Sequence, residues 1–166
     1  KYLDCYYSGD YALKDDDGYL WLLGRADDVL KIAGHRIGTA ELESCIVSND
    51  DVAESAVCGI PDEVKGEVII AFVVLRHNVI TSTTELEKQL IIKIRNDVGA
   101  IASPKQIYFV SKLPKTRSGK IMRRLLKSIA NNETIGDVST LEDGTAVTEV
   151  QSVFDEIQKT INKKPE

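Results

Sequence analysis

Histidine and cysteine are scarce in this sequence of 166 residues, which argues against several kinds of site. The two histidines, His35 and His77, are too few for an imidazole-rich metal centre. The three cysteines, Cys5, Cys45 and Cys58, are odd in number and have no C-x-x-C spacing, which argues against a disulfide framework or a zinc site. We therefore expect no resident metal, and a reducing compartment, the cytoplasm, fits best.

Long apolar runs and an excess of positive charge are also missing. No stretch approaches the roughly 18 apolar residues of a membrane span, and no secretory signal is visible. The formal net charge of −5 gives no general attraction to nucleic acid or anionic lipid. We therefore expect neither nucleic acid nor a membrane as a partner. The content of 43% hydrophobic and 28% charged residues is that of an ordinary globular domain with a core.

The apolar pattern predicts an α+β fold, in which helices cover a small mixed sheet. Residues 10–23 are expected to form an N-terminal β-hairpin, because 15–18 (DDDG) is a strong turn signal. Further strands are expected at 29–32, 51–60, 68–75 and 106–110, the uniformly apolar 68–75 being central. Helices are expected at 39–48, at 82–98 behind a capping box, and at 121–130. A C-terminal amphipathic helix is expected through Val147, Val150, Phe154, Ile157 and Ile161.

The stretch 114–120, PKTRSGK, is the most informative part of the chain. It places Lys120 after a Ser-Gly turn and before an apolar and basic run. The compact charge of Lys120 is thus carried on a flexible side chain whose backbone is held in a rigid segment. The stretch is not a P-loop, because Pro114 replaces the first glycine and Ile121 replaces the Ser or Thr that would hold magnesium. Taken alone, a lysine in this setting is more often a solvated surface charge.

Three segments resemble the signatures of one enzyme family, in the family's order. Residues 114–120 resemble the C-terminal lysine motif of the acyl-adenylate-forming enzymes, in the form typical of acetyl-CoA synthetases. Residues 24–37, GRADDVLKIAGHRI, resemble the family's hinge and the glycine loop that follows it, and 7–10, YSGD, resembles its ribose motif. The resemblance covers about residues 2–143. It implies an AMP-forming acetate–CoA ligase, which makes acetyl-AMP from acetate and ATP and then acetyl-CoA.

The resemblance also assigns roles in the first half-reaction. Lys120 would be the catalytic cation that meets the negative charge developing where acetate attacks the α-phosphate of ATP. Acetylation of Lys120 would remove that charge and stop adenylation. Asp10 would accept hydrogen bonds from the ribose hydroxyls, and Arg25 would reach the ribose-phosphate part, although these residues could also be a plain turn aspartate and a surface arginine. Arg36 offers a further phosphate partner.

For the second half-reaction, the resemblance places Gly34 beside the CoA thiol arm, where a glycine allows close backbone approach. Arg95 matches a family arginine that meets the CoA nucleotide, although by itself it is an exposed helical arginine. Ala33 stands where acetyl-CoA synthetases more often have Ser, so a hydroxyl contact to CoA is lost. Asp27 would be the hinge between the two half-reactions, its alternative being an ordinary cap or loop residue. A lone histidine is more often structural, so we assign no catalysis to His35.

The resemblance divides the chain into three parts. Residues 1–26 would be the end of a large N-terminal AMP-binding domain, 27–134 a mobile C-terminal domain, and 135–166 an extension. The chain starts at Lys1 without a methionine, which also indicates a C-terminal fragment of a larger protein. We expect the fragment to be inactive alone, because the ATP loop and the acyl pocket belong to the missing N-terminal domain.

ATP, CoA and Mg²⁺ are implied by the reaction, and no magnesium ligand is identified in the sequence. Two alternatives stay open. The enzyme could be a propionyl or other short-chain acyl-CoA synthetase, since acyl choice belongs to the absent pocket. The chain could instead be a free-standing, non-catalytic partner or regulatory domain.

Overall fold

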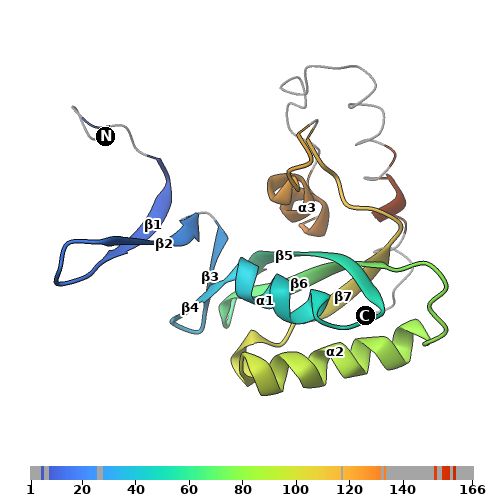
Figure 1. Cartoon of the computed structure of the whole chain (residues 1–166). Helices are drawn as coiled ribbons and strands as arrows, with labels where there is room; N and C mark the ends of the chain where they lie inside the picture. Colours follow the sequence, from blue (N-terminus) through green and yellow to red (C-terminus); the bar gives the residue numbers. More distant parts are fainter. Residues whose placement is uncertain are drawn as a thin grey trace.

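The structure is a computed structural model that describes residues 5, 8–25, 28–116, 118–131, 133, 152, 155–157 and 159. These residues form two separate β-hairpins and a three-stranded sheet with helices on both faces, so the predicted α+β class is confirmed (Figure 1). Among the described helices, none has the length and apolar character that crossing a membrane requires.

The first hairpin pairs β1 (Asp10–Lys14) with β2 (Leu20–Arg25) in antiparallel register, as predicted. Gly18 supplies the positive φ of the turn, at +90°, and its N–H donates to the carbonyl of Asp15 at 3.1 Å. The Asp15 carboxylate accepts the indole N–H of Trp21 at 2.8 Å, and this bond lowers the pKa of Asp15. The hairpin stands apart from the sheet (Figure 1). Four of its described large apolar side chains are exposed: Leu13, Tyr19, Leu20 and Trp21.

The second hairpin pairs β3 (Val29–Ile32) with β4 (His35–Gly38). The sequence predicts β3 but not β4, because a glycine at position 34 indicates the end of a lone strand. Ala33 and Gly34 both have positive φ, +47° and +85°, which makes a two-residue turn of the kind that reverses a chain into a hairpin. The glycine thus closes a hairpin. The N–H of Ala33 donates to the carbonyl of Lys65 at 3.0 Å and holds the turn against the central sheet.

The central sheet has the order β5–β6–β7, formed by β5 (Val52–Asp62), β6 (Gly66–Leu75) and β7 (Gln106–Val110). β6 pairs antiparallel with β5 and parallel with β7, so the sheet is mixed. The apolar run 68–75 lies in the middle strand, as predicted, because a strand covered on both faces needs apolar residues at every position.

The helices α1 (Thr39–Val47) and α2 (Thr83–Asp97) also lie where the sequence predicts them. The capping box of α2 is confirmed, since the Ser82 hydroxyl accepts the N–H of Glu85 at 3.3 Å. A short 3₁₀ turn, η2 (Ala100–Ala102), follows Gly99, whose φ of +124° few other residues adopt.

The last labelled helix, α3 (Arg123–Ala130), begins two residues later than predicted. Ile121 forms a β-bridge with Lys115, and the N–H of Met122 donates to the carbonyl of Pro114 at 2.9 Å. These pairings keep 121 and 122 out of the helix, so the helix starts after them.

The sheet separates two apolar clusters. The first contains residues of α1, α2 and the β3–β4 hairpin, including Leu42, Ile46 and Leu90. The second contains residues of α3, including Leu126 and Ile129, so the helices cover opposite faces of the sheet (Figure 1).

The C-terminal segment joins the second cluster. Ile157 is helical and buried there, and the neighbouring Glu156 carboxylate accepts the N–H of Ser111 at 3.0 Å. The other residues of the predicted C-terminal stripe, Val147, Val150, Phe154 and Ile161, lie outside the described residues.

Candidate functional site

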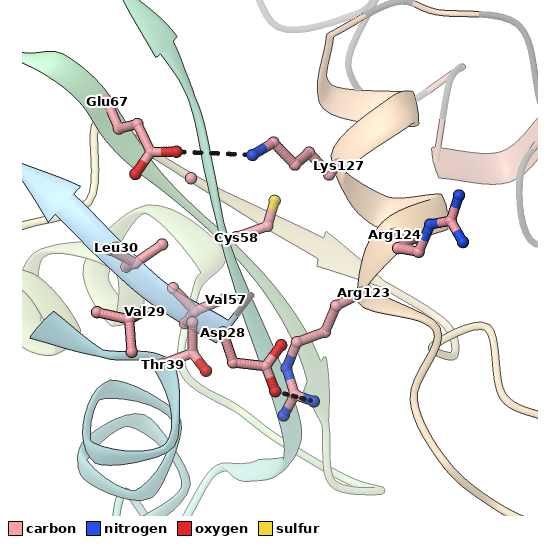
Figure 2. Close-up of a pocket in the computed structure, with 11 residues that line it drawn as sticks. Asp28, Val29, Leu30, Thr39, Val57, Cys58, Glu67, Arg123, Arg124 and Lys127 are labelled. Atoms are coloured by element: carbon pink, nitrogen blue, oxygen red, sulfur yellow. Dashed lines mark ion pairs between the residues drawn. The ribbon is translucent and has the colours of Figure 1, made fainter. Parts of the chain in front are cut away.

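A small pocket of about 170 Å³ opens between β3, β5 and α3 (Figure 2). Two ion pairs lie among its lining residues: Lys127 with Glu67 at 3.6 Å and Arg123 with Asp28 at 3.6 Å. Ligand pockets usually measure roughly 300–1,000 Å³, so this one is too small for a nucleotide. We therefore do not take it as a substrate site.

Cys58 lines the same pocket and is unsuited to nucleophilic catalysis. Its side chain is buried, and burial raises the pKa of its thiol to about 12. Since the thiolate is the reactive form of cysteine, a thiol that stays protonated is inert near neutral pH.

The described motif residues, 115–116 and 118–121, form a tight hairpin that presents Lys120. The N–H of Thr116 donates to the Lys120 carbonyl at 2.8 Å, and the Thr116 hydroxyl accepts the Lys120 N–H at 3.1 Å. Gly119 makes the turn with a φ of +82°, and Lys115 and Ile121 close the hairpin as a β-bridge. The Lys120 side chain is exposed, and its ammonium pairs with none of the described residues. The loop thus offers a positioned cation for an incoming anion.

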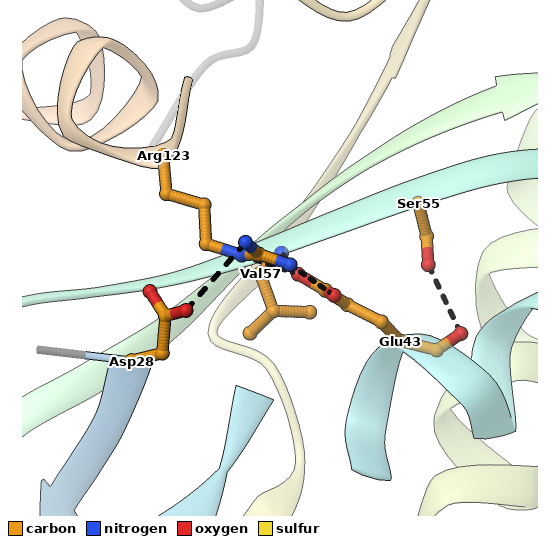
Figure 3. Close-up of polar contacts among 5 residues, drawn as sticks. All are labelled: Asp28, Glu43, Ser55, Val57 and Arg123. Carbon is orange, nitrogen blue, oxygen red and sulfur yellow. Dashed lines mark hydrogen bonds and ion pairs between the residues drawn. The ribbon is translucent and has the colours of Figure 1, made fainter. Parts of the chain in front are cut away.

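Two ion pairs fix the ends of this hairpin. Before it, the Lys115 ammonium lies 2.8 Å and 2.7 Å from the two carboxylate oxygens of Glu54 on β5. After it, Arg123 donates from Nε to Glu43 Oε1 at 3.0 Å and from Nη2 to Oε2 at 2.7 Å (Figure 3). The second pair has the parallel two-bond geometry that favours arginine over lysine.

Sequence reasoning missed these four anchoring residues. Glu54 lies 61 positions before Lys115, and Glu43 lies 80 positions before Arg123. No local spacing rule connects residues so far apart, because only the folded sheet brings them together.

The residues predicted to contact the adenylate ribose lie opposite each other. Asp10 begins β1, Arg25 ends β2, and the two are register partners in the hairpin. The hairpin therefore brings this predicted pair to one end of its ladder. The predicted hinge residue, Asp27, lies outside the described residues.

The residues predicted to contact CoA lie on elements that pack on the first apolar cluster. Gly34 is at the tip of the β3–β4 turn, with no atom within 4 Å of where a Cβ would be. Arg95 is exposed in the last turn of α2, and Arg36, the predicted phosphate partner, is exposed on β4. Lys120 instead precedes α3, which covers the other face of the sheet.

No group of three or more histidine, cysteine, aspartate or glutamate residues within the described part of the chain is placed to hold a metal ion.

Residues 41–120 match the family model for the AMP-binding enzyme C-terminal domain. Residues 41–120 therefore correspond to an AMP-binding enzyme C-terminal domain. The chain is 60% identical over 153 residues to the acetyl-coenzyme A synthetase of Pyrobaculum aerophilum, a match to 92% of this chain and 23% of that protein. It is 50% identical over 161 residues to the 3-hydroxypropionyl-coenzyme A synthetase of Metallosphaera sedula, covering 97% of this chain and 24% of that protein.

Solved structures agree with the fold of the AMP-binding C-terminal domain. The crystal structure of the Brucella canis acyl-CoA synthetase matches with a TM-score of 0.61 at 40% identity, over 75% of this chain and 23% of that one. An anthranilate CoA ligase in complex with anthranoyl-AMP matches with a TM-score of 0.64 at 38% identity, over 74% of this chain and 24% of that one. The chain thus spans about a quarter of the length of the relatives it matches.

Proposed function

We propose that this chain is the C-terminal part of an AMP-forming acetate–CoA ligase. The observation that carries the proposal is the exposed Lys120 on a hydrogen-bonded hairpin, within a motif of the acyl-adenylate-forming enzymes. The 60% identity to an acetyl-coenzyme A synthetase supports acetate as the substrate.

In the first half-reaction, an acetate oxygen attacks the α-phosphorus of ATP and pyrophosphate leaves, giving acetyl-AMP. Lys120 meets the charge that accumulates on the acetate and phosphate oxygens, so it stabilises the transition state more than the ground state. Asp10 accepts hydrogen bonds from the ribose hydroxyls, while Arg25 and Arg36 bind phosphate oxygens. Magnesium, which the reaction implies, would be bound together with the phosphates of the nucleotide.

In the second half-reaction, the CoA sulfur attacks the acetyl carbonyl and AMP leaves. Gly34 allows close approach of the thiol arm, and Arg95 binds the CoA nucleotide. These residues and Lys120 belong to elements on opposite faces of the sheet, which supports a swing of residues 27–134 about Asp27 between the half-reactions.

The remaining parts belong to the larger enzyme. The exposed apolar side chains of the β1–β2 hairpin support residues 1–26 as the end of a large N-terminal domain, which supplies the ATP loop and the acyl pocket. Residues 135–166 are an extension, of which Ile157 packs on the α3 face. The three cysteines of this chain, which show no disulfide spacing, support a cytoplasmic location for the ligase.

A second candidate is a ligase for another short-chain acid, favoured by the 50% identity to a 3-hydroxypropionyl-coenzyme A synthetase. The test is ATP–pyrophosphate exchange by the full-length protein with acetate, propionate and 3-hydroxypropionate. We expect the highest kcat/KM with acetate and no exchange by the isolated chain. A preference for another acid assigns the second candidate. Absence of exchange with all three acids, from a full-length protein that folds, contradicts the ligase and favours a non-catalytic regulatory domain.

A further inference from the structure

We propose that Glu43, Glu54, Lys115 and Arg123 form a clasp that positions Lys120 for adenylation. This inference rests on the proposed function for its catalytic part, while its structural part concerns the hairpin alone. The four residues are positioning residues, because they act on the reaction through Lys120.

The clasp grips the hairpin on both sides. Lys115 stands at its first position and is bound by Glu54, whereas Arg123 follows its last position by two residues and is bound by Glu43. The hairpin's own hydrogen bonds fix its shape, but they do not fix its place on the domain. The two ion pairs supply that attachment.

Both carboxylates of the clasp lie beside one edge of the central sheet. Glu54 is part of β5, which is an edge strand. Glu43 comes from α1, and its Oε1 accepts the N–H of Val57 on β5 at 2.9 Å, while its main-chain carbonyl accepts the Ser55 hydroxyl at 3.1 Å (Figure 3). Arg123 therefore reaches across this edge from α3 on one face to α1 on the other.

The Arg123–Glu43 half of the clasp is the stronger one. The two side chains are only 25% and 13% exposed, and they share two parallel hydrogen bonds. Lys115 and Glu54 are 38% and 40% exposed, so water screens that pair more. Loss of Glu43 should therefore loosen the hairpin more than loss of Glu54.

Arg123 also connects the hairpin to the segment that leaves the predicted hinge. Its Nη1 lies 3.6 Å from Asp28, the residue after Asp27 (Figure 3). A rotation at the hinge would thus be transmitted through the Arg123 side chain to α3, the helix that follows Lys120. This matters because catalysis loses about 10²-fold when a reacting group is misplaced by about 1 Å.

The first test is structural and needs no substrate. Hydrogen exchange is followed on this chain at the amides of Thr116, Gly119 and Lys120 in wild type, Glu43→Gln and a control, Glu41→Gln. The control removes the same charge from an exposed position of α1. We expect these amides to exchange about tenfold faster in Glu43→Gln only, with α2 amides unchanged. Unchanged loop exchange in a folded Glu43→Gln overturns the clasp.

A charge swap between Glu54 and Lys115 keeps the test valid even if Glu43→Gln does not fold. Glu54→Gln should speed loop exchange less than Glu43→Gln, and the double variant Glu54→Lys with Lys115→Glu should restore protection. If the double variant exchanges as fast as either single charge reversal, the Lys115–Glu54 pair does not hold the loop.

The second test separates the half-reactions in the full-length enzyme. Glu43→Gln should slow acetyl-AMP formation by about 10- to 100-fold, while acetyl transfer from supplied acetyl-AMP to CoA stays within about twofold. Equal loss in both half-reactions overturns the positioning role. Absence of acetate-dependent adenylation in the wild type, together with the expected exchange result, contradicts the proposed function and leaves the structural clasp standing.

Discussion

The carboxylate of Glu67 on β6 accepts the backbone N–H of Lys31 on β3 at 2.7 Å. Its other oxygen lies 3.6 Å from the ammonium of Lys127 on α3. One side chain therefore ties the hairpin that carries Gly34 to the central sheet and to the helix that follows the lysine hairpin. The loop proposed for the CoA step and the loop proposed for the adenylation step are therefore both held through Glu67.

Gly59→Ala should disturb this support. A Cβ at Gly59 would lie 2.9 Å from Leu30 Cδ2 and 3.2 Å from the carboxylate carbon of Glu67. Both side chains would have to move, so we expect a loss of about 1–3 kcal/mol in the free energy of unfolding, measured with urea. In a Leu30→Ala background the same change should cost less, because the nearest atom is gone. Strict additivity of the two substitutions would contradict the contact.

Cys58 should make stability fall at alkaline pH. Burial raises its pKa from the ordinary 9.0 to about 12 in the fold, so the unfolded chain releases this proton first. The contribution is fully present below about pH 9 and falls by about 1.4 kcal/mol per pH unit between about 9 and 12. Urea unfolding at about pH 8 and about pH 10 should show a loss in wild type that exceeds the loss in Cys58→Ala by about 1.4 kcal/mol. Equal losses would show that the thiol is not buried.

Lys120→Ala should act on one half-reaction. We expect acetyl-AMP formation by the full-length enzyme to fall by about 10²–10³-fold, because the cation proposed to face the developing charge is gone. Acetyl transfer from supplied acetyl-AMP should continue, and enzyme carrying acetyl-lysine at 120 should behave in the same way. Lys88→Ala, which removes an exposed lysine from α2, is the matched control. Undiminished acetyl-AMP formation by the acetylated enzyme would exclude regulation at this residue.

Gly34→Ala should act on the other half-reaction. With φ at +85°, a side chain here costs about 1 kcal/mol of backbone strain, although no atom lies within 4 Å of the new Cβ. The methyl group should raise the KM for CoA and leave ATP–pyrophosphate exchange unchanged. If exchange falls as well, the turn does not belong to the CoA step alone.

Much of the fold could be predicted because its signals are local. The capping box at Ser82, the turn at Gly18 and the apolar run 68–75 each lie within a few residues, where chemistry and geometry are tightly linked. β4 could not be predicted, because a glycine after a short strand can either end the strand or turn the chain back into a hairpin. The positive φ of Ala33 shows that the chain turns back here.

The site was less predictable. Lys120 could be predicted from a contiguous motif, whereas its anchors could not. Glu43 and Arg123 meet only because α1 and α3 pack on opposite faces beside the same edge strand, a consequence of the whole topology. The pairing of Asp10 with Arg25 was only partly predictable, because the hairpin could be predicted but the register that pairs these two residues could not.

The first hairpin carries an intrinsic fluorescent probe on its strand β2. Trp21 is its single tryptophan, 61% exposed, with the indole N–H held by Asp15. A water-facing indole emits at long wavelength, and covering it shifts the emission to the blue. The emission wavelength of Trp21 can therefore report, without any added label, when another protein surface covers this hairpin.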